Sequence, residues 1–216
     1  MRILLVAATA AEIDPLARGT RRFARAGHDV DVLVTGVGMV PTAAHVSAVL
    51  ARQHFDWALN VGLCGSFDSA LPPGTVVHIV SEELAEVGAE DGEGFRTLTE
   101  LRLLQKDEFP FQDARLVNTS PPGNEVIGRL PRVNGITVNT VHGNERSIAA
   151  VVQRCHPQVE SMEGAAFMYA CLLQRMPFAE VRAVSNVVER RNRGAWKMAE
   201  AIDNLNVTAA EIIEHA

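Results

Sequence analysis

The chain has 216 residues, of which 47% are hydrophobic and 21% are charged, and its formal net charge at pH 7 is −6. This length and composition are those of a globular protein with a sizeable core, so we expect residues 1–216 to form a single domain. The acidic balance argues against a general nucleic-acid-binding surface, which needs clustered positive charge.

Cysteine use indicates the compartment. Cys64, Cys155 and Cys171 are widely spaced and form no C-x-x-C pair. Their odd number and spacing argue against a disulfide framework and against a zinc site, so we expect a reducing, cytoplasmic location. No apolar run approaches the ~20 residues that a membrane helix needs, and we expect no membrane partner.

The first half of the chain alternates apolar runs with helical segments. Residues 3–8 are a continuous apolar run, which predicts a strand covered on both faces. A short signal peptide is the alternative, and the acidic residues that follow at once disfavour it. We predict further strands over 29–35, 57–61 and 75–80, and helices over 12–18 and 41–54.

Residues 82–134 are the least regular part, and we expect loops with a few short elements there. After them we predict strands over 136–141 and 178–185, helices over 147–154 and 163–174, and a closing helix from 194 to the C-terminus. Strands that alternate with helices indicate an α/β fold.

Polar residues follow two strand-like runs in the second half. Met162 and Glu163 open a helix, where free backbone N–H groups and the helix dipole favour an anion or a hydroxyl-rich ligand. Ser185 and Asn186 end the next strand. Because ligands of α/β sheets bind at the carboxyl ends of strands, we expect these residues to form walls of one pocket.

Three segments of the first half have two interpretations each. Glu12 follows the first strand and is either a general base on water or an exposed helix-start carboxylate. Gly36 and Gly38 precede a helix and either admit an anion or form a plain turn; the dinucleotide fingerprint fails because Pro41 replaces its third glycine. Gly62 begins a Gly-rich turn after a strand and either lets a ligand lie flat against the backbone or serves the turn itself.

A cationic segment follows the strand that ends in Asn186. Arg190, Arg191 and Arg193 stand close to Trp196. A charge run is usually a solvated face, but an arginine here could pair bidentately with a substrate carboxylate. None of the seven histidines has metal-ligand spacing, and His142, at a predicted strand end, is the one that we single out.

Taken in order, these motifs resemble the purine nucleoside phosphorylase and nucleosidase family over nearly the whole chain. The resemblance rests on Glu12 and on residues 35–38, 60–65, 161–163 and 185–186. It implies an α/β three-layer sandwich with a central mixed, mostly parallel sheet flanked by helices. It also implies a small-molecule nucleoside substrate, no metal or organic cofactor, and a homodimer or larger homo-oligomer.

The nearest branch that the chain resembles is the methylthioadenosine/adenosylhomocysteine nucleosidases. The resemblance implies that Glu12 positions the attacking water, that Glu163 binds the ribose hydroxyls and that Met162 packs against the sugar. That branch has an Asp that protonates purine N7 where this chain has Asn186. An amide cannot act as an acid at neutral pH, but it complements a 6-oxo group and a ring N–H. We therefore predict hypoxanthine rather than adenine as the leaving base.

Residues 185–196 also resemble the futalosine hydrolase branch, enzymes of menaquinone biosynthesis that release hypoxanthine from a nucleoside with a 5′ benzoate. Arg191 or Arg193 is then predicted to bind the carboxylate. Residues 143–146 lack the aromatic that nucleosidases often place near the base. The alternatives are a nucleosidase that keeps adenine chemistry, a phosphorylase with phosphate near Gly36 and Gly38, and a non-catalytic nucleoside-binding protein. A nicotinamide-dependent oxidoreductase ranks last.

Overall fold

The computed structural model describes residues 1–92 and 94–216. The strands are β1 (Arg2–Ala7), β2 (Arg22–Arg25), β3 (His28–Val34), β4 (Trp57–Ser66), β5 (Val76–Leu84), β6 (Gly88–Asp91), β7 (Gly94–Thr97), β8 (Phe111–Gln112), β9 (Arg115–Val117), β10 (Arg132–Thr137), β11 (Val159–Ser161) and β12 (Phe178–Val187). The helices are α1 (Ala10–Ala17), α2 (Met39–Leu50), α3 (Glu125–Arg129), α4 (Glu145–Cys155), α5 (Gly164–Leu173) and α6 (Met198–Glu214), with a 3₁₀ turn at Arg193–Ala195.

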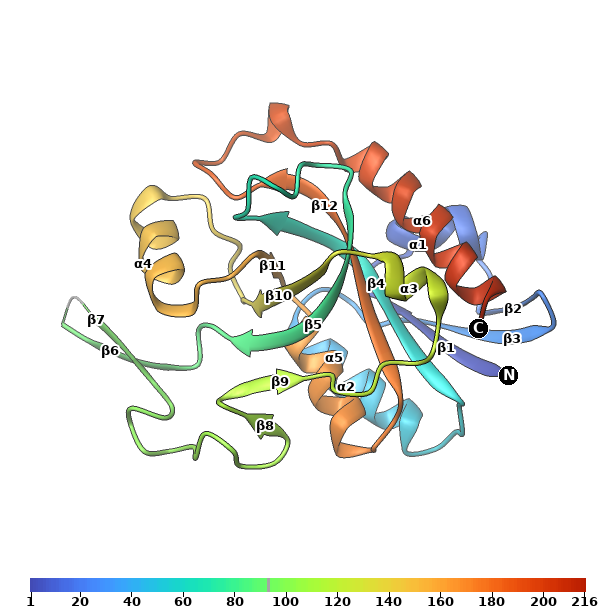
Figure 1. The fold of residues 1–216 in the computed structure, drawn as a ribbon, viewed down its shortest axis with the longest axis horizontal. Coiled ribbons are helices and arrows are strands. Elements are labelled where there is room, and N and C mark those ends of the chain that lie inside the picture. The colour runs from blue at the N-terminus through green and yellow to red at the C-terminus, as the bar shows by residue number, and fades with distance from the viewer. Residues whose placement is uncertain (93) are drawn as a thin grey trace.

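Ten strands form one mixed sheet that is partly closed (Figure 1). Its order is β2-β3-β1-β4-β11-β10-β5-β9-β8, and β12 pairs with both β4 and β5. The β12–β4 ladder is parallel and the β12–β5 ladder is antiparallel. Strands β4, β11, β10, β5 and β12 therefore close into a five-stranded barrel, from which the other strands extend.

Helices lie in two groups around this sheet. Helices α1 and α3 each contact α6 on one side, and α2 packs on α5 on the other (Figure 1). Strand β1 lies between two apolar cores. Ile3 and Leu5 belong to the core on the side of α1, α3 and α6, and Leu4 and Val6 belong to the core on the side of α2 and α5. This alternation is the period of two of a strand with both faces buried, which explains the unbroken apolar run near the N-terminus.

The α/β class and the mixed sheet are confirmed, but the three-layer sandwich that we predicted does not include the closed barrel. Closure depends on β12 bridging β4 and β5, a long-range pairing that leaves no local sequence signal. The strand predicted over 136–141 is wrong by four residues, since β10 spans Arg132–Thr137. The irregular stretch holds a few short elements, as expected. Two of them, β6 and β7, are largely exposed strands without an apolar pattern, and residue 93 lies outside the described residues.

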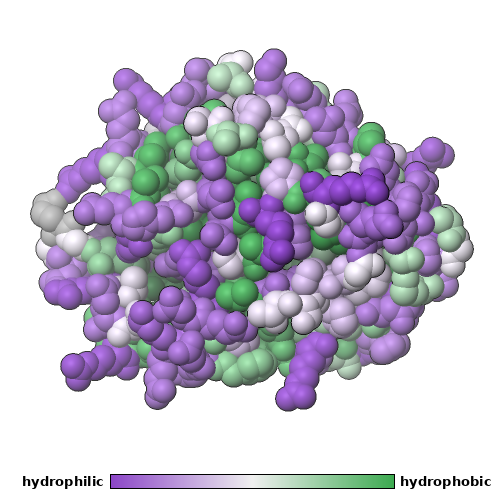
Figure 2. All heavy atoms as spheres, viewed as in Figure 1, coloured by the Kyte–Doolittle hydropathy of each residue, from purple (hydrophilic) through white to green (hydrophobic). Residues whose placement is uncertain are grey.

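One face of the molecule is mainly polar. Figure 2 shows hydrophilic side chains over most of one face, with apolar residues visible between them towards its middle. In the described part of the chain, no helix combines the length and the apolar character that crossing a membrane requires.

The Gly-rich turn predicted after residue 61 is wrong. Strand β4 continues to Ser66, and Gly62 is not among the positive-φ glycines. A Cβ atom on Gly62 would collide with Nη1 of Arg182 and would lie 3.1 Å from Oε1 of Glu12. The glycine therefore leaves room for a buried guanidinium rather than for a ligand.

We expect Gly62→Ala to lower the free energy of unfolding by about 1–3 kcal/mol, the usual cost of overpacking a core. Urea unfolding measures it. The matched control is Gly128→Ala in α3, where a Cβ atom meets nothing within 4 Å. Wild-type stability for Gly62→Ala would contradict this explanation of the glycine.

Candidate active site

A cavity of about 330 Å³ opens where β1, β4, β11 and β12 end. Six of the predicted site residues lie on its wall: Glu12, Met162, Glu163, Ser185, Asn186 and Arg191. Gly36, Gly38, Gly62 and Arg193 are not part of that wall. Other wall residues are Val37, Leu63, Cys64, Gly65, Val141, His142, Glu160 and Trp196. The two strand ends that we expected to share a pocket therefore do so.

The Glu12 side chain is fixed at both oxygens. It lies in the first turn of α1 and reaches back to the N-cap residue, accepting hydrogen bonds from Thr9 N at 2.8 Å and Thr9 Oγ1 at 3.0 Å through Oε2. Oε1 accepts from the backbone N–H of Leu63 at 3.3 Å. The carboxylate is thus both a helix cap and a fixed acceptor on the cavity wall.

Glu163 is the N-cap of α5 rather than a residue of its first turn. Its Oε1 accepts from the backbone N–H of Gly38 at 2.9 Å, and its Oε2 lies 3.5 Å from Nη1 of Arg182. Gly38 has φ +100°, a conformation that favours glycine. The loop before α2 therefore orients a carboxylate on the cavity wall.

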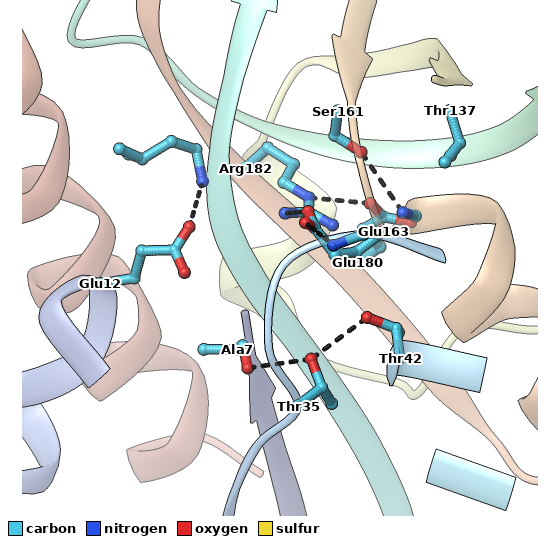
Figure 3. Close-up of polar contacts among 12 residues, drawn as sticks. Ala7, Glu12, Thr35, Thr42, Thr137, Ser161, Glu163, Glu180 and Arg182 are labelled. Carbon is cyan, nitrogen blue, oxygen red and sulfur yellow. Dashed lines mark hydrogen bonds and ion pairs between the residues drawn. The ribbon is translucent and has the colours of Figure 1, made fainter. Parts of the chain in front are cut away.

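The same loop is anchored at its start. The Thr35 hydroxyl is 3.4 Å from the carbonyl oxygen of Ala7 and 3.1 Å from the hydroxyl of Thr42 (Figure 3). Gly36, at φ +93°, turns the chain away from this anchor. Gly36 and Gly38 are not part of the cavity wall themselves. Val37, which lies between them, is the residue of this loop that lines the cavity.

A buried ionic cluster lies inside the barrel beside Glu163 (Figure 3). Arg182 is 1% exposed, and its Nε donates to Glu180 Oε1 at 2.9 Å. Its Nη1 faces Glu163 as described above. The sequence analysis missed Arg182, although a charged residue within the apolar run 178–184 was a usable signal, since charges are rarely buried unless paired.

Glu82 is a second buried carboxyl group in the barrel. It accepts from Thr137 Oγ1 at 2.8 Å. A Cβ atom on Gly164 would collide with Oε1 of both Glu82 and Glu180, so the two carboxyl groups approach one another. Burial, and next the charge of Glu180, raise the pKa of Glu82 well above its ordinary value. The folded protein therefore favours the neutral form of Glu82 up to a higher pH than is usual for a carboxyl group.

The amide of Asn186 is oriented by its neighbours. Its Oδ1 accepts from Ser185 Oγ at 2.8 Å, and its Nδ2 donates to Val187 O at 2.9 Å. One N–H and one lone pair remain for a ligand. Ser185 is buried, and its Oγ also lies 3.2 Å from Cys64 O. The Ser185 hydroxyl therefore helps to hold the Asn186 amide in its orientation on the cavity wall.

The cationic segment is held together by an indole ring. The guanidinium carbons of Arg191 and Arg193 lie 5.3 and 5.9 Å from the ring centroid of Trp196. Arg191 N donates to Gly143 O at 3.2 Å, which ties this segment to the loop before α4. Arg191 and Trp196 line the cavity, so of the two arginines left open by the sequence, Arg191 is the better placed.

Two further observations concern reactive groups. Cys64 lines the cavity, and burial raises the pKa of its thiol to about 12, so it is not a thiolate nucleophile at neutral pH. Within residues 1–92 and 94–216, no group of three or more His, Cys, Asp or Glu side chains is arranged to hold a metal ion.

Known proteins resemble the chain over most of its length. A family model of the phosphorylase superfamily matches residues 5–216. A futalosine hydrolase of Acidothermus cellulolyticus is 32% identical over 214 residues, which cover 94% of this chain and 86% of that protein. A futalosine hydrolase of Thermus thermophilus is 30% identical over 179 residues, covering 80% and 76%. A 5′-methylthioadenosine/S-adenosylhomocysteine nucleosidase of Colwellia psychrerythraea is 25% identical over 201 residues, covering 87% and 78%.

Solved structures share the fold. The Colwellia psychrerythraea nucleosidase in complex with adenine has a TM-score of 0.80 at 18% identity and covers 100% of this chain and 95% of that one. A futalosine hydrolase mutant of Helicobacter pylori has a TM-score of 0.81 at 14% identity, with 100% of both chains covered. The chain belongs to the phosphorylase superfamily.

The raised pKa of Glu82 predicts a pH-dependent effect of Glu82→Gln. A raised pKa in the folded state stabilises the protein below the ordinary pKa of the group, and this stability is lost as the pH rises towards the raised value. We expect Glu82→Gln to remove that loss, so its stability relative to wild type should increase from pH 5 to pH 8, by up to about 1.4 kcal/mol per pH unit.

Urea unfolding at both pH values measures the difference. Glu211→Gln, at an exposed position of α6, is the control for the loss of one carboxylate. A stability difference between Glu82→Gln and wild type that does not change with pH would mean that Glu82 is ionised in the folded state.

Proposed function

We propose that this member of the phosphorylase superfamily is an N-glycosyl hydrolase that splits futalosine into hypoxanthine and dehypoxanthine futalosine, a step of menaquinone biosynthesis. The observation that carries the proposal is the amide of Asn186 on the cavity wall, with Arg191 and Trp196 on the same wall. The identity to the futalosine hydrolases also exceeds that to the Colwellia psychrerythraea nucleosidase.

Glu163 and Met162 are assigned to the ribose. The carboxylate of Glu163 is acceptor-only and is held by Gly38 and Arg182, which suits the 2′ and 3′ hydroxyl groups. Hydrogen bonds from these hydroxyls strengthen as positive charge develops on the ring, so they stabilise the transition state more than the ground state. Met162 lies beside Glu163 and offers a soft apolar contact under the sugar.

Glu12 is assigned to the attacking water. Its two oxygens are held by Thr9 and Leu63, so the carboxylate does not need to reorganise when water binds. It takes one proton from the water as the oxygen bonds to C1′ of the sugar. General-base assistance of this kind contributes on the order of 10²- to 10⁴-fold.

Asn186 is assigned to the base. Its free N–H donates to the 6-oxo group or to N7, and its oxygen accepts from the ring N–H. The amide thereby spreads the negative charge that develops on the departing purine. The 6-amino group of adenine is a hydrogen-bond donor and would face the N–H donor of Asn186. Two donors cannot pair, so adenine is disfavoured.

Arg191 is assigned to the 5′ carboxylate of the substrate. Its guanidinium lies against the Trp196 ring, which orients the charge without neutralising it. A benzoate ring would also find an apolar surface in Trp196. A substrate without a carboxylate at its 5′ end would leave Arg191 with no anionic group to bind.

Methylthioadenosine-type nucleosidase activity is the second candidate, because Glu12, Met162 and Glu163 serve the same roles for either substrate. Asn186 separates the two candidates. A phosphorylase is less well supported, because Gly38 already donates its N–H to Glu163. A homo-oligomer and a cytoplasmic location stay predictions, and light scattering of the purified protein tests the first.

Incubation of the purified protein with futalosine, inosine or methylthioadenosine, with and without phosphate, tests the function. We expect hypoxanthine from futalosine, at a rate independent of phosphate. Glu12→Gln should lower kcat about 10²-fold or more, because the amide cannot accept the proton of water. Asp14→Asn, an exposed residue of the same helix, is the matched control.

Each other outcome has a meaning. Adenine from methylthioadenosine would move the chain to the second candidate, and phosphate-dependent release from inosine would identify a phosphorylase. Bound nucleoside with no product would identify a non-catalytic binding protein. Normal turnover by Glu12→Gln would remove Glu12 from the mechanism.

Asn186→Asp should change the preferred base. Loss of the amide donor should lower kcat/KM for futalosine about tenfold or more relative to 6-amino-6-deoxyfutalosine, since one mismatched hydrogen bond costs about 1–3 kcal/mol. Both substrates carry the same 5′ group, so the ratio isolates the base. Asn139→Asp, at an exposed site, controls for the added charge. An unchanged ratio would show that Asn186 does not select the base.

A further inference from the structure

The assigned residues leave one chemical task without a side chain. A purine leaves more easily when it takes up a proton, and the amide of Asn186 has none to give at neutral pH. Glu12 is assigned to water, and Glu163 faces Gly38 and Arg182. Another acid on the cavity wall is therefore needed if the base is to leave protonated.

We propose that His142, held by Glu160, is the acid that protonates the departing purine; the proposal rests on the proposed function. Both residues line the cavity. Neither residue is among those assigned to the sugar, the water, the base or the 5′ carboxylate. The sequence singled out only His142, at a predicted strand end, and gave it no role.

Glu160 holds His142 at two points. Its Oε2 lies 2.6 Å from His142 Nδ1, and its Oε1 accepts the backbone N–H of His142 at 3.0 Å. The Glu160 side chain is 3% exposed and that of His142 is 10% exposed. A carboxylate only accepts, so the proton of this contact belongs to Nδ1. Nε2 is then the ring atom left for a ligand, and in the described part of the chain it has no protein partner.

Strand register places this pair at the same end of the cavity as Asn186. On β4, Gly65 pairs with Glu160 of β11 on one side and with Asn186 of β12 on the other. A Cβ atom on Gly65 would lie 3.3 Å from Asn186 Nδ2 and 3.6 Å from Glu160 Cγ. The residue that anchors His142 and the amide assigned to the base therefore flank one glycine. His142 is thus on the base side of the site and not on the sugar side.

Further contacts keep the imidazole in place. The ring of Phe67 meets the His142 ring edge-on, with centroids 6.3 Å apart at 65°. The next residue, Gly143, accepts the backbone N–H of Arg191 through its carbonyl oxygen. The loop that carries His142 is consequently tied to the segment assigned to the 5′ carboxylate.

The proton balance of the step is simple. The Nε2–H bond of the imidazolium breaks, and the proton forms an N–H bond at N7 of the purine, while the free N–H of Asn186 donates to the 6-oxo group. The electron pair of the C1′–N9 bond goes to the base, which leaves as neutral hypoxanthine. Water supplies the oxygen to C1′ and one proton to Glu12. His142 and Glu12 then return to their starting states by proton exchange with solvent.

A histidine suits this task because its charge changes near neutral pH. The other titratable groups on the wall are Glu12, Glu160, Glu163, Glu189, Arg191 and the neutral thiol of Cys64. Carboxyl side chains in general ionise below the neutral range, and arginine stays charged throughout it. A loss of activity on the alkaline side of neutrality that disappears with the imidazole therefore reports His142.

The test compares wild type with His142→Gln on futalosine, following kcat and KM from pH 5.5 to 9 in the absence of phosphate. Glutamine keeps a hydrogen-bond donor but cannot transfer a proton. We expect kcat to fall about 10²- to 10⁴-fold with KM little changed, and the alkaline limb of the wild-type profile to disappear. Glu160→Gln should give a smaller fall in kcat. His54→Gln, at an exposed position, is the matched control.

Thermal melts and hypoxanthine binding by calorimetry show whether each variant is folded with an intact site. A folded His142→Gln that keeps kcat within about threefold, or that changes KM alone, would overturn the acid role. If His142→Gln fails to fold, a displaced alkaline limb in Glu160→Gln, which keeps the imidazole but removes its carboxylate partner, supports the role, and an unchanged limb overturns it. Failure of wild type to release hypoxanthine from futalosine would instead overturn the proposed function, and this proposal with it.

Discussion

The buried guanidinium of Arg182 is the constraint on which the site depends. Burying an unpaired charge costs several kcal/mol, so the closed barrel can hold this cation only together with its carboxylates. Glu180 pairs with Nε and Glu163 faces Nη1, while burial and the charge of Glu180 raise the pKa of Glu82 and so disfavour a third negative charge. One of these carboxylates, Glu163, is also a wall residue of the cavity. Its position is therefore fixed by the ionic balance of the protein core, and a ligand meets a carboxylate that is already oriented.

Strand β4 spaces the two halves of the site. At Gly62 it leaves room for Arg182, which faces Glu163, and for Glu12, the residue that we assign to water. At Gly65 it lies between Glu160 and Asn186, the residues that we assign to the side of the base. Three residues of an extended strand span about 10 Å, roughly the length over which a nucleoside presents its sugar and its base. Both glycines serve close approach by side chains of neighbouring strands, and neither needs a positive φ.

The sequence predicted the strand ends but not what supports them. Met162–Glu163 and Ser185–Asn186 were recognisable because polar residues interrupt apolar runs where strands end, and the structure places them on one cavity. The turn prediction at Gly62 was wrong because glycine favours turns in the sequence alone. Only the pairing with β12 shows that Arg182 occupies the space beside this glycine. Arg182 and Glu160 act through β12 and β11, whose pairing with β4 is long-range and has no local pattern. The barrel was missed for the same reason, because β12 reads as an ordinary strand.

An amide in place of an acid divides two tasks that a single carboxylic acid would combine. An Asp at position 186 would have to recognise the base and give it a proton with the same group, and in its ionised form it would complement a 6-amino rather than a 6-oxo purine. With Asn186, recognition no longer depends on protonation, because an amide has the same donor and acceptor at any physiological pH. The proton can then come from a group with its own support, and the Glu160-held imidazole lies on the other side of Gly65. In the proposed mechanism, Asn186 thus selects the 6-oxopurine, and a separate group, the imidazole of His142, protonates the leaving base.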